Sequence, residues 1–412
     1  MIKVIDNKWT RAAIPALLIH CSIGTVYCWS TFKEAIAEQI EMSTFSVGWA
    51  FSLAIFFLGI SAAFAGEIVE IDIQKSSLIS CWCFFIGMMG TGMSIFLFKG
   101  ISALIGVYVF YGCIMGIGLG IGYITPVKNL MLWFSDQKGL ATGISIMGFG
   151  LAKAIATPIM EWMQAYTGLT MMFIYLSIVY WIVMFIAHLL IKKPNNWSEK
   201  DKTDNNFILK DIVTNKSFIL IWLMFYLNIH CGLMIITYEK QILNTLSTSI
   251  IIVSVIPSVT ALCNALGRIG YATLSDKLKD RLSVYQVIFW LSLSTIGIYL
   301  LITIFASNDV IAIMIWCIIV LITINLGYGG GFSTLPALLS QKFGMDNISK
   351  IHGLMLTAWA IAGVTGNNLS ELILKNTKMN YNYLFFTIEL LYILAFLCCL
   401  IELKRGYKNG NT

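Results

Sequence analysis

Twelve long apolar stretches constrain the fold of this chain more than any other feature of its sequence. A helix that rises about 1.5 Å per residue needs roughly 20 mainly apolar residues to cross about 30 Å of hydrocarbon. Stretches of this length lie near residues 11–32, 44–65, 76–98, 101–124, 139–160, 170–191, 217–238, 249–271, 284–305, 309–331, 351–373 and 382–402. Backbone groups in lipid must be paired within the segment, and these stretches are too long for barrel strands. The sequence therefore predicts an all-α membrane protein with twelve transmembrane helices.

Composition excludes several other classes of protein. Hydrophobic residues make up 58% of the chain and charged residues 12%, whereas soluble chains average about 45–50% and about 25%. All ten cysteines lie inside apolar stretches, so neither a disulfide framework nor a metal site is expected. The sequence contains no phosphate-binding GxxxxGK(S/T) motif, no HExxH motif and no catalytic constellation. We therefore expect no cofactor and no enzymatic activity.

The distribution of basic residues predicts the orientation of the helices. Cytoplasmic loops carry an excess of Lys and Arg, and an even number of spans places both termini on one side. Most of the 27 basic residues, Lys128 among them, fall in segments that are internal if the termini are cytoplasmic. The outer segments hold only Lys33, Lys99, Lys240, Lys375 and Lys378. We expect a multi-pass protein of the plasma or inner membrane with cytoplasmic termini, whose net charge of +6 reflects topology rather than nucleic-acid binding.

A polar segment divides the twelve stretches into two groups of six. This segment has the composition of an inter-domain linker. We expect a six-helix transmembrane domain over residues 1–191, a cytoplasmic linker over 192–216, a second six-helix domain over 217–403 and a cytoplasmic tail over 404–412.

An internal repeat relates the two groups of helices. The segments GYITPVKNLMLWF and GFSTLPALLSQKF overlay with matches at Gly122/Gly331, Tyr123/Phe332, Thr125/Thr334 and Phe134/Phe343. Each segment ends the fourth apolar stretch of its half, which predicts two parallel six-helix repeats. Such repeats are typical of secondary transporters with a substrate site between the halves.

Two basic residues fall inside the predicted spans, where a charge needs a partner or a wet cavity. Helix geometry places Arg268 about 12 Å and Lys153 about 21 Å from the inner face. A fixed guanidinium binds a substrate carboxylate through paired hydrogen bonds. Alternatively, the deep acid Glu389 pairs internally with either cation. A proton symporter needs an acid or a histidine on a cavity helix, for which His230 and His352 are the remaining candidates.

Several segments spread over nearly the whole chain carry a family resemblance. They are NKWTRAAIPALL with GTVYCWSTF, GIGYITPVKNLMLWFSDQKGLATGISIMGFGLA, NALGRIGYATLSDKLKDR and GYGGGFSTLPALL. These segments resemble those of the oxalate/formate antiporter family of the major facilitator superfamily. The resemblance implies secondary transport of small carboxylates by alternating access, in which the two halves rock around a central anion site. It also implies a monomer.

The resemblance further implies which residues bind substrate. Arg268 aligns with the family's substrate-binding arginine in the eighth span. Tyr27 and Tyr123 align with cavity tyrosines of the first and fourth spans.

Other pocket positions differ from the family's pattern. Trp359 stands where the oxalate-transporting member relies on a lysine, and Tyr328 and Phe332 stand in place of a tryptophan and a tyrosine. A single aligned cation in an apolar pocket favours a monocarboxylate such as formate, lactate or pyruvate, because an unpaired charge in a dry cavity is costly. Lys153, where the family typically has a small or apolar residue, offers a second cation. A dicarboxylate exchanger for an oxalate-like anion therefore stays open as an alternative.

The loop after the eighth span resembles the superfamily's gating motif. The residues that carry this resemblance are Gly267, Asp276, Lys277 and Arg281. The corresponding loop after the second span, GEIVEIDIQK, has Glu67, Glu70 and Asp72 in place of most of the expected basic residues.

Together these features predict a secondary active transporter of small organic anions in the lipid bilayer, with Arg268 as the substrate's counter-ion. The coupling partner is either a proton or a counter-anion, and the sequence does not choose between symport and antiport. A membrane sensor that does not transport remains an alternative, and such a protein would tolerate the loss of Arg268.

Overall fold

The computed structural model describes residues 7–194, 209–247 and 249–408. Every regular element within these ranges is a helix, which confirms the predicted all-α class. Most of the expected linker 192–216 and the end of the expected tail 404–412 lie outside the described residues.

The chain divides into two compact units, and each is described by itself. Unit 1 contains residues 1–206 and 342–360, and unit 2 contains residues 207–341 and 361–412. These units group residues by contacts in space, whereas the expected domains follow sequence order and remain a prediction. The segment 342–360, expected in the C-terminal domain, packs with unit 1.

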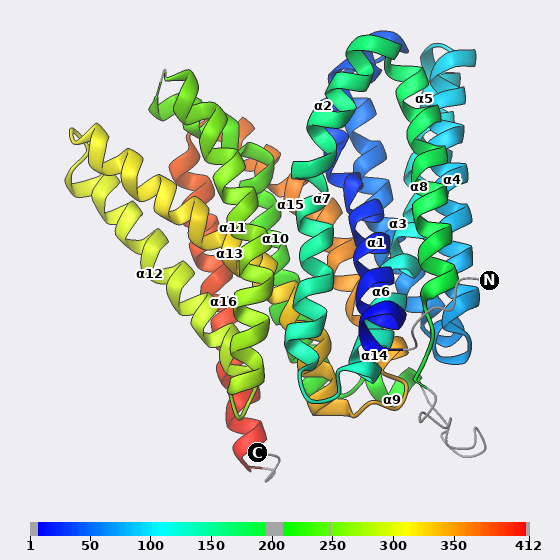
Figure 1. Cartoon of the computed structure of the whole chain (residues 1–412). Coiled ribbons are helices and arrows are strands. Elements are labelled where there is room, and N and C mark those ends of the chain that lie inside the picture. Colours follow the sequence, from blue (N-terminus) through cyan, green and yellow to red (C-terminus); the bar gives the residue numbers. More distant parts are fainter. Residues whose placement is uncertain (1–6, 195–208, 248, 409–412) are drawn as a thin grey trace. The chain divides into compact units, whose positions relative to one another are not determined.

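Unit 1 is a bundle of helices (Figure 1). Its elements are the π-helical turn η1 (Trp9–Ala13), α1 (Ile14–Ile23), the 3₁₀ segment η2 (Gly24–Cys28), α2 (Trp29–Gln39), α3 (Thr44–Ile71), α4 (Ile73–Leu97), α5 (Gly100–Val107), the π-helical segment η3 (Tyr108–Met115), α6 (Gly116–Trp133), α7 (Lys138–Thr167), α8 (Leu169–Leu190), α14 (Ile348–Met355) and the first turn of α15 (Thr357–Asn376). Helix α4 packs against α6 and α8, and α3 packs against α6 and α14.

Unit 2 is a second bundle of long helices. Its elements are α9 (Leu209–Val213), α10 (Lys216–Leu246), α11 (Ile250–Lys277), α12 (Ser283–Phe305), α13 (Val310–Phe343, of which the last two residues belong to unit 1), the remainder of α15 and α16 (Tyr381–Lys408). Helix α16 packs against both α10 and α12.

Side-chain caps explain where two helices of unit 1 begin. The Ser43 hydroxyl accepts a hydrogen bond from the Ser46 N–H at 3.1 Å, at the start of α3. The Asp72 carboxylate accepts one from the Lys75 N–H at 2.9 Å, at the start of α4. Each cap satisfies a backbone donor that has no partner inside the helix. Asp72, one of the acids that replace the expected basic residues, therefore separates α3 from α4.

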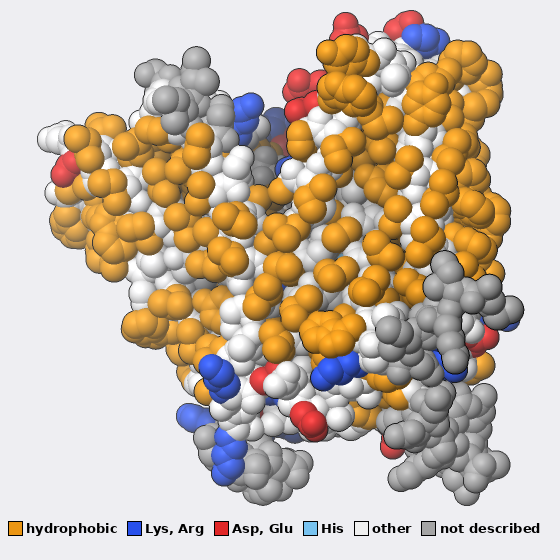
Figure 2. Space-filling view, in the orientation of Figure 1, with side chains coloured by type: hydrophobic (Ala, Val, Ile, Leu, Met, Phe, Trp, Pro, Cys, Tyr) orange, Lys and Arg blue, Asp and Glu red, His pale blue; other side chains and the backbone are white. Residues whose placement is uncertain are grey.

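Eleven helices within the described ranges are long and apolar enough to cross a membrane. The one remaining stretch of the twelve expected, residues 249–271, is not among these eleven. It overlaps α11, a helix of 28 residues. Large apolar side chains point outward, for example Phe64 and Phe305, which are 78% and 83% exposed. Figure 2 shows hydrophobic side chains over the helix faces and charged side chains near the helix ends. Such a surface suits hydrocarbon rather than water, so the chain is a multi-pass membrane protein.

Candidate functional site

Arg268 is buried within α11, where it is 1% exposed. Its Nε–H donates a hydrogen bond to Oδ1 of Asn264 at 3.1 Å. The two residues are four apart, so their side chains project from one face of the helix. Because the guanidinium is planar and its five donors form a rigid fork, a bond at Nε orients the whole group. Helix α11 therefore both carries Arg268, which is predicted to bind the substrate's carboxylate, and orients its guanidinium.

An aromatic ring of α13 lies beside this guanidinium and contacts further rings of α13 and α10. The Arg268 Cζ atom lies 5.6 Å from the centroid of the Phe332 ring. The Phe332 ring contacts Tyr328 and Phe225, with ring centroids 5.2 Å apart in each pair. A cation over an aromatic face contributes about 2 kcal/mol or more when it is desolvated. Asn264 and these four residues form the arginine cluster of unit 2, which brings together the predicted site residues Arg268, Tyr328 and Phe332.

Glycines allow the helices of the arginine cluster to approach closely. A Cβ atom added at Gly329 would lie 2.0 Å from the backbone O of Asn264, and one at Gly267 would lie 2.2 Å from the backbone O of Leu326. Real Cβ atoms do not approach other atoms this closely, and backbone atoms cannot rotate away. Gly267, predicted as part of the gating motif, therefore holds α11 against α13 in this structure.

A second cluster of rings lies in unit 1. The centroid of the Tyr123 ring lies 5.7 Å from that of Phe149 and 5.6 Å from that of Trp359, and Phe149 and Trp359 are 5.8 Å apart. The half-buried Tyr27 ring lies 5.3 Å from Phe149. We call these four residues the aromatic cluster. A Cβ at Gly24 would lie 2.3 Å from the backbone O of Phe149, so this glycine lets the first span reach α7.

His20 connects the aromatic cluster to neighbouring helices. Its Nε2 lies 3.2 Å from the backbone O of Tyr123, and its Nδ1 lies 2.6 Å from the Ser145 hydroxyl. A carbonyl oxygen only accepts, so Nε2 carries the hydrogen and Nδ1 accepts from Ser145 in the neutral ring. His20 thus joins α1 to α6 and α7 with both ring nitrogens bonded.

Lys153 lies on α7, one turn after Phe149. Its Nζ donates a hydrogen bond to the exposed Ser30 hydroxyl at 3.3 Å. The side chain is half-buried, and its spacing of four from Phe149 places both on one face of α7.

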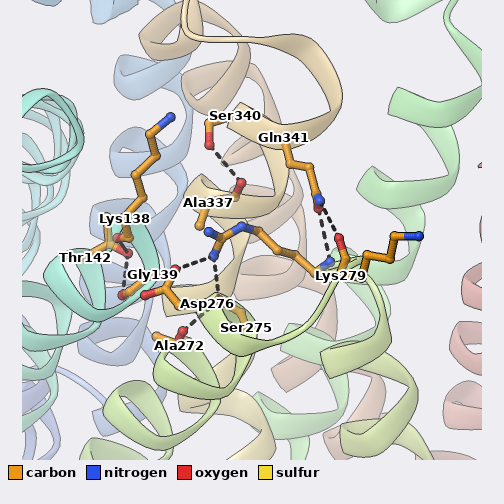
Figure 3. Close-up of polar contacts among 11 residues, drawn as sticks. Lys138, Gly139, Thr142, Ala272, Ser275, Asp276, Lys279, Ala337, Ser340 and Gln341 are labelled. Carbon is orange, nitrogen blue, oxygen red and sulfur yellow. Dashed lines mark hydrogen bonds and ion pairs between the residues drawn. The ribbon is translucent and has the colours of Figure 1, made fainter. Parts of the chain in front are cut away.

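Polar contacts hold the loop that follows α11, and Figure 3 labels Ser275, Asp276 and Gln341 among the residues that make them. The Arg281 guanidinium forms an ion pair with the Asp276 carboxylate at 2.6 Å and donates to the Ser275 hydroxyl at 2.9 Å. The Gln341 side chain accepts from the Arg281 N–H at 3.1 Å and donates to a backbone carbonyl of the same loop at 2.9 Å. Of the predicted gating residues, Asp276 and Arg281 are thus in direct contact, whereas Lys277 is exposed.

A buried ion pair links three helices of unit 1. Lys128 is 2% exposed, and its Nζ lies 2.8 Å from Oε2 of Glu70 and 3.2 Å from the backbone O of Met345. The other carboxylate oxygen of Glu70 accepts from the Ser349 N–H at 2.7 Å. The basic-residue count treated Lys128 as part of an inner segment, but the structure buries it inside α6. Glu70 therefore joins α3 to α6 and α14.

Sequence reasoning missed several residues of these clusters. Asn264 could have been predicted, because it lies four residues before Arg268 and can bond to it along the helix. The roles of Phe149 and His20 and the ion pair of Lys128 could not, because these contacts join segments far apart in the sequence.

All ten cysteines are free thiols. Within the described ranges, no group of three or more His, Cys, Asp or Glu side chains is arranged to hold a metal ion.

The sequence profile of the Major Facilitator Superfamily matches residues 16–367. The chain belongs to this superfamily, and it is therefore a transporter rather than an enzyme. Its fold is similar to that of the proton:xylose symporter XylE, with a TM-score of 0.69 and 15% sequence identity over 95% of this chain and 94% of that one. The predicted superfamily fold is confirmed.

Characterised and uncharacterised relatives match the chain at low identity. The MFS-type transporter YhjX of Escherichia coli (strain K12), described as uncharacterized, is 26% identical over 87% of this chain and 86% of its own length. The oxalate:formate antiporter of Oxalobacter formigenes is 22% identical over 92% of this chain and 88% of its own. Apicoplast pyruvate carrier 1 of Toxoplasma gondii is 23% identical over 37% of this chain and 35% of its own. The resemblance to the oxalate/formate antiporter family is thus confirmed.

Proposed function

We propose that the chain is a secondary active transporter of small monocarboxylates, such as formate, lactate or pyruvate, and that it works by alternating access. The observation that carries this proposal is Arg268, a permanently charged group that is 1% exposed within α11. Ionisable groups at membrane depth are costly and mark substrate or ion pathways. A carboxylate is the matching ligand, because its two oxygens accept a pair of hydrogen bonds from the guanidinium fork.

The charges of the buried residues support a substrate with one carboxylate. Among the described residues, the buried cations are Arg268 and Lys128, and Lys128 is paired with Glu70. A dianion brings a second negative charge, which needs a second cation in a dry site.

Lys153 favours a dicarboxylate exchanger as the second candidate function. It shares a face of α7 with Phe149 of the aromatic cluster. Its contact with Ser30 is with a neutral hydroxyl, so this contact does not neutralise its charge. An oxalate-like anion would use Arg268 and Lys153 as its two cations.

The aromatic residues are proposed to shape the pocket for the apolar part of the substrate. They are Tyr27, Tyr123, Tyr328, Phe332 and Trp359. The names of two relatives support a small carboxylate, since one is an oxalate:formate antiporter and another a pyruvate carrier.

We further propose that the protein acts as a monomer in the plasma or inner membrane, with both termini in the cytoplasm. A proton or a counter-anion moves with the substrate. Gly267, Asp276 and Lys277 of α11, together with Arg281 in the loop that follows, control the change between the two states of access.

The experiment that tests this proposal is uptake of labelled formate, lactate, pyruvate, oxalate and succinate into proteoliposomes. The native chain is compared with Arg268→Gln and with Lys153→Ala, which serves as a control variant that also loses a basic side chain. We expect monocarboxylate uptake that is lost in Arg268→Gln and retained in Lys153→Ala.

Two results would change the proposal. Uptake of oxalate or succinate that requires both cations would favour the dicarboxylate exchanger. Transport that is indifferent to Arg268 would contradict its role as counter-ion, and absence of transport with all five anions would contradict the substrate class.

A further inference from the structure

His352 is a buried titratable side chain that the proposed anion site does not use. It lies on α14, is 2% exposed, and its ring centroid is 6.0 Å from that of Tyr123 in the aromatic cluster. Its Nε2 is buried without a hydrogen-bond partner among the described residues. A buried nitrogen without a partner is costly. A histidine here therefore points to a state of the protein in which this nitrogen gains a partner.

The other three histidines differ from His352 in their surroundings. Both ring nitrogens of His20 are already bonded, Nε2 to the Tyr123 carbonyl and Nδ1 to the Ser145 hydroxyl. His188 is half-buried, and its Nδ1 lies 3.0 Å from a serine hydroxyl. His230 of unit 2 has a buried Nδ1 without a partner, but its ring contact is with Tyr226 at 5.3 Å. Only His352 combines a buried, unbonded nitrogen with contact to the aromatic cluster in the described part of the chain.

The charged groups on the helices that pack against α14 are either exposed or paired with each other. Helix α14 packs against α3 and α6. On α3, Glu67 is exposed, and Glu70 is bonded to the backbone of α14 and paired with Lys128 of α6. Glu70 and Lys128 thus neutralise each other.

The remaining titratable groups leave His352 as the proton acceptor. Tyr123 of α6 carries a phenol rather than a basic nitrogen. His20 of α1 also contacts the Tyr123 ring, and both of its ring nitrogens are bonded. On α14 itself, Lys350 lies two residues before His352, a spacing at which helix side chains do not face each other.

We propose that Nε2 of His352 takes up a proton when the substrate binds beside the aromatic cluster, so that anion and proton are transported together. This inference rests on the proposed function, because it assigns the coupling ion of the same transporter. A dry imidazole takes up a proton most readily when an anion is close. The added N–H lets the buried nitrogen donate a hydrogen bond to the bound substrate. If each ligand favours binding of the other, the loss of either one weakens binding of the one that remains.

The test separates exchange from proton-driven accumulation in proteoliposomes. Counterflow of labelled formate, lactate or pyruvate against the same unlabelled anion needs binding and alternating access but no net proton movement. Accumulation driven by an inward pH gradient needs the proton as well. The full-length native chain is compared with His352→Gln and His352→Asn, with His230→Gln as the matched control for a buried histidine.

We expect both His352 variants to keep counterflow and to lose gradient-driven accumulation, while His230→Gln retains both. Counterflow also shows that each variant is folded. Accumulation that persists in the His352 variants, or that is lost only in His230→Gln, would overturn the proposal. Loss of counterflow in both His352 variants would also overturn it, because His352 would then serve packing or anion binding. If the native chain itself shows no counterflow, the proposed function fails and the inference fails with it.

Discussion

Replacing Glu70 by glutamine removes the negative charge that lies 2.8 Å from the buried ammonium group of Lys128. Breaking a buried ion pair from one side costs about 3–5 kcal/mol, because the other charge is left uncompensated. Lys128 keeps its bond to the Met345 carbonyl at 3.2 Å, so we expect a loss near 3 kcal/mol in the free energy of unfolding.

The opposite substitution, Lys128→Met, has a smaller expected cost. The Glu70 side chain is 19% exposed and keeps its bond to the Ser349 N–H, so water and that donor still solvate the charge. The loss is that of one hydrogen bond between charged groups, about 1.5–3 kcal/mol. The double variant leaves no buried charge unpaired, so it should be more stable than Glu70→Gln alone.

Equilibrium unfolding of the purified full-length chain in mixed detergent micelles measures these free energies. The native chain, both single variants and the double variant form a double-mutant cycle. A double variant that is less stable than Glu70→Gln would refute the reasoning, because the buried ammonium group would then not be the source of the cost.

Three further predictions concern the arginine cluster, its neighbouring glycine and Lys153. Gly329→Ala should destabilise the chain by about 1–3 kcal/mol and reduce uptake, because its Cβ would lie 2.0 Å from the backbone O of Asn264. The control Gly270→Ala, whose Cβ would have nothing within 4 Å, should be neutral or stabilising in the same unfolding assay. Asn264→Asp places a carboxylate 3.1 Å from Nε of Arg268 and should raise KM for the transported monocarboxylate about tenfold or more; an unchanged KM would show that the substrate does not compete for the guanidinium. Lys153→Ala should keep monocarboxylate uptake within about twofold of native, and a larger loss would assign Lys153 to the site.

Hydropathy was sufficient to predict the class of fold, because each membrane helix must bury its backbone bonds within one continuous apolar segment. It was less informative about helix ends. The stretch 44–65 was expected as a span, but α3 continues to Ile71, because Glu70 finds partners at the end of the helix and Asp72 caps the next one. Hydropathy alone does not show which polar residues near a helix end are paired.

The sequence indicated Arg268 because a charge in an apolar stretch is conspicuous, and the family resemblance implies a substrate-binding arginine at the same position. Its neighbours Tyr328 and Phe332 were also indicated, and the structure brings all three together. The contacts between His20 and Tyr123 or between Lys128 and Glu70 join residues that are tens of positions apart. Such pairs depend on how helices pack against one another, which a local pattern does not specify.

The most direct test of the central claim is concentration-dependent counterflow of labelled lactate, formate and pyruvate by the native chain, Arg268→Lys and Arg268→Gln. Removing one partner of a buried charge pair costs about 2–5 kcal/mol, so Arg268→Gln should lower kcat/KM by about 30-fold to several thousand-fold. Arg268→Lys keeps the charge but not the fork and should fall between the two. Equal kcat/KM values for all three proteins would contradict the account, because Arg268 would then not bind the substrate's carboxylate.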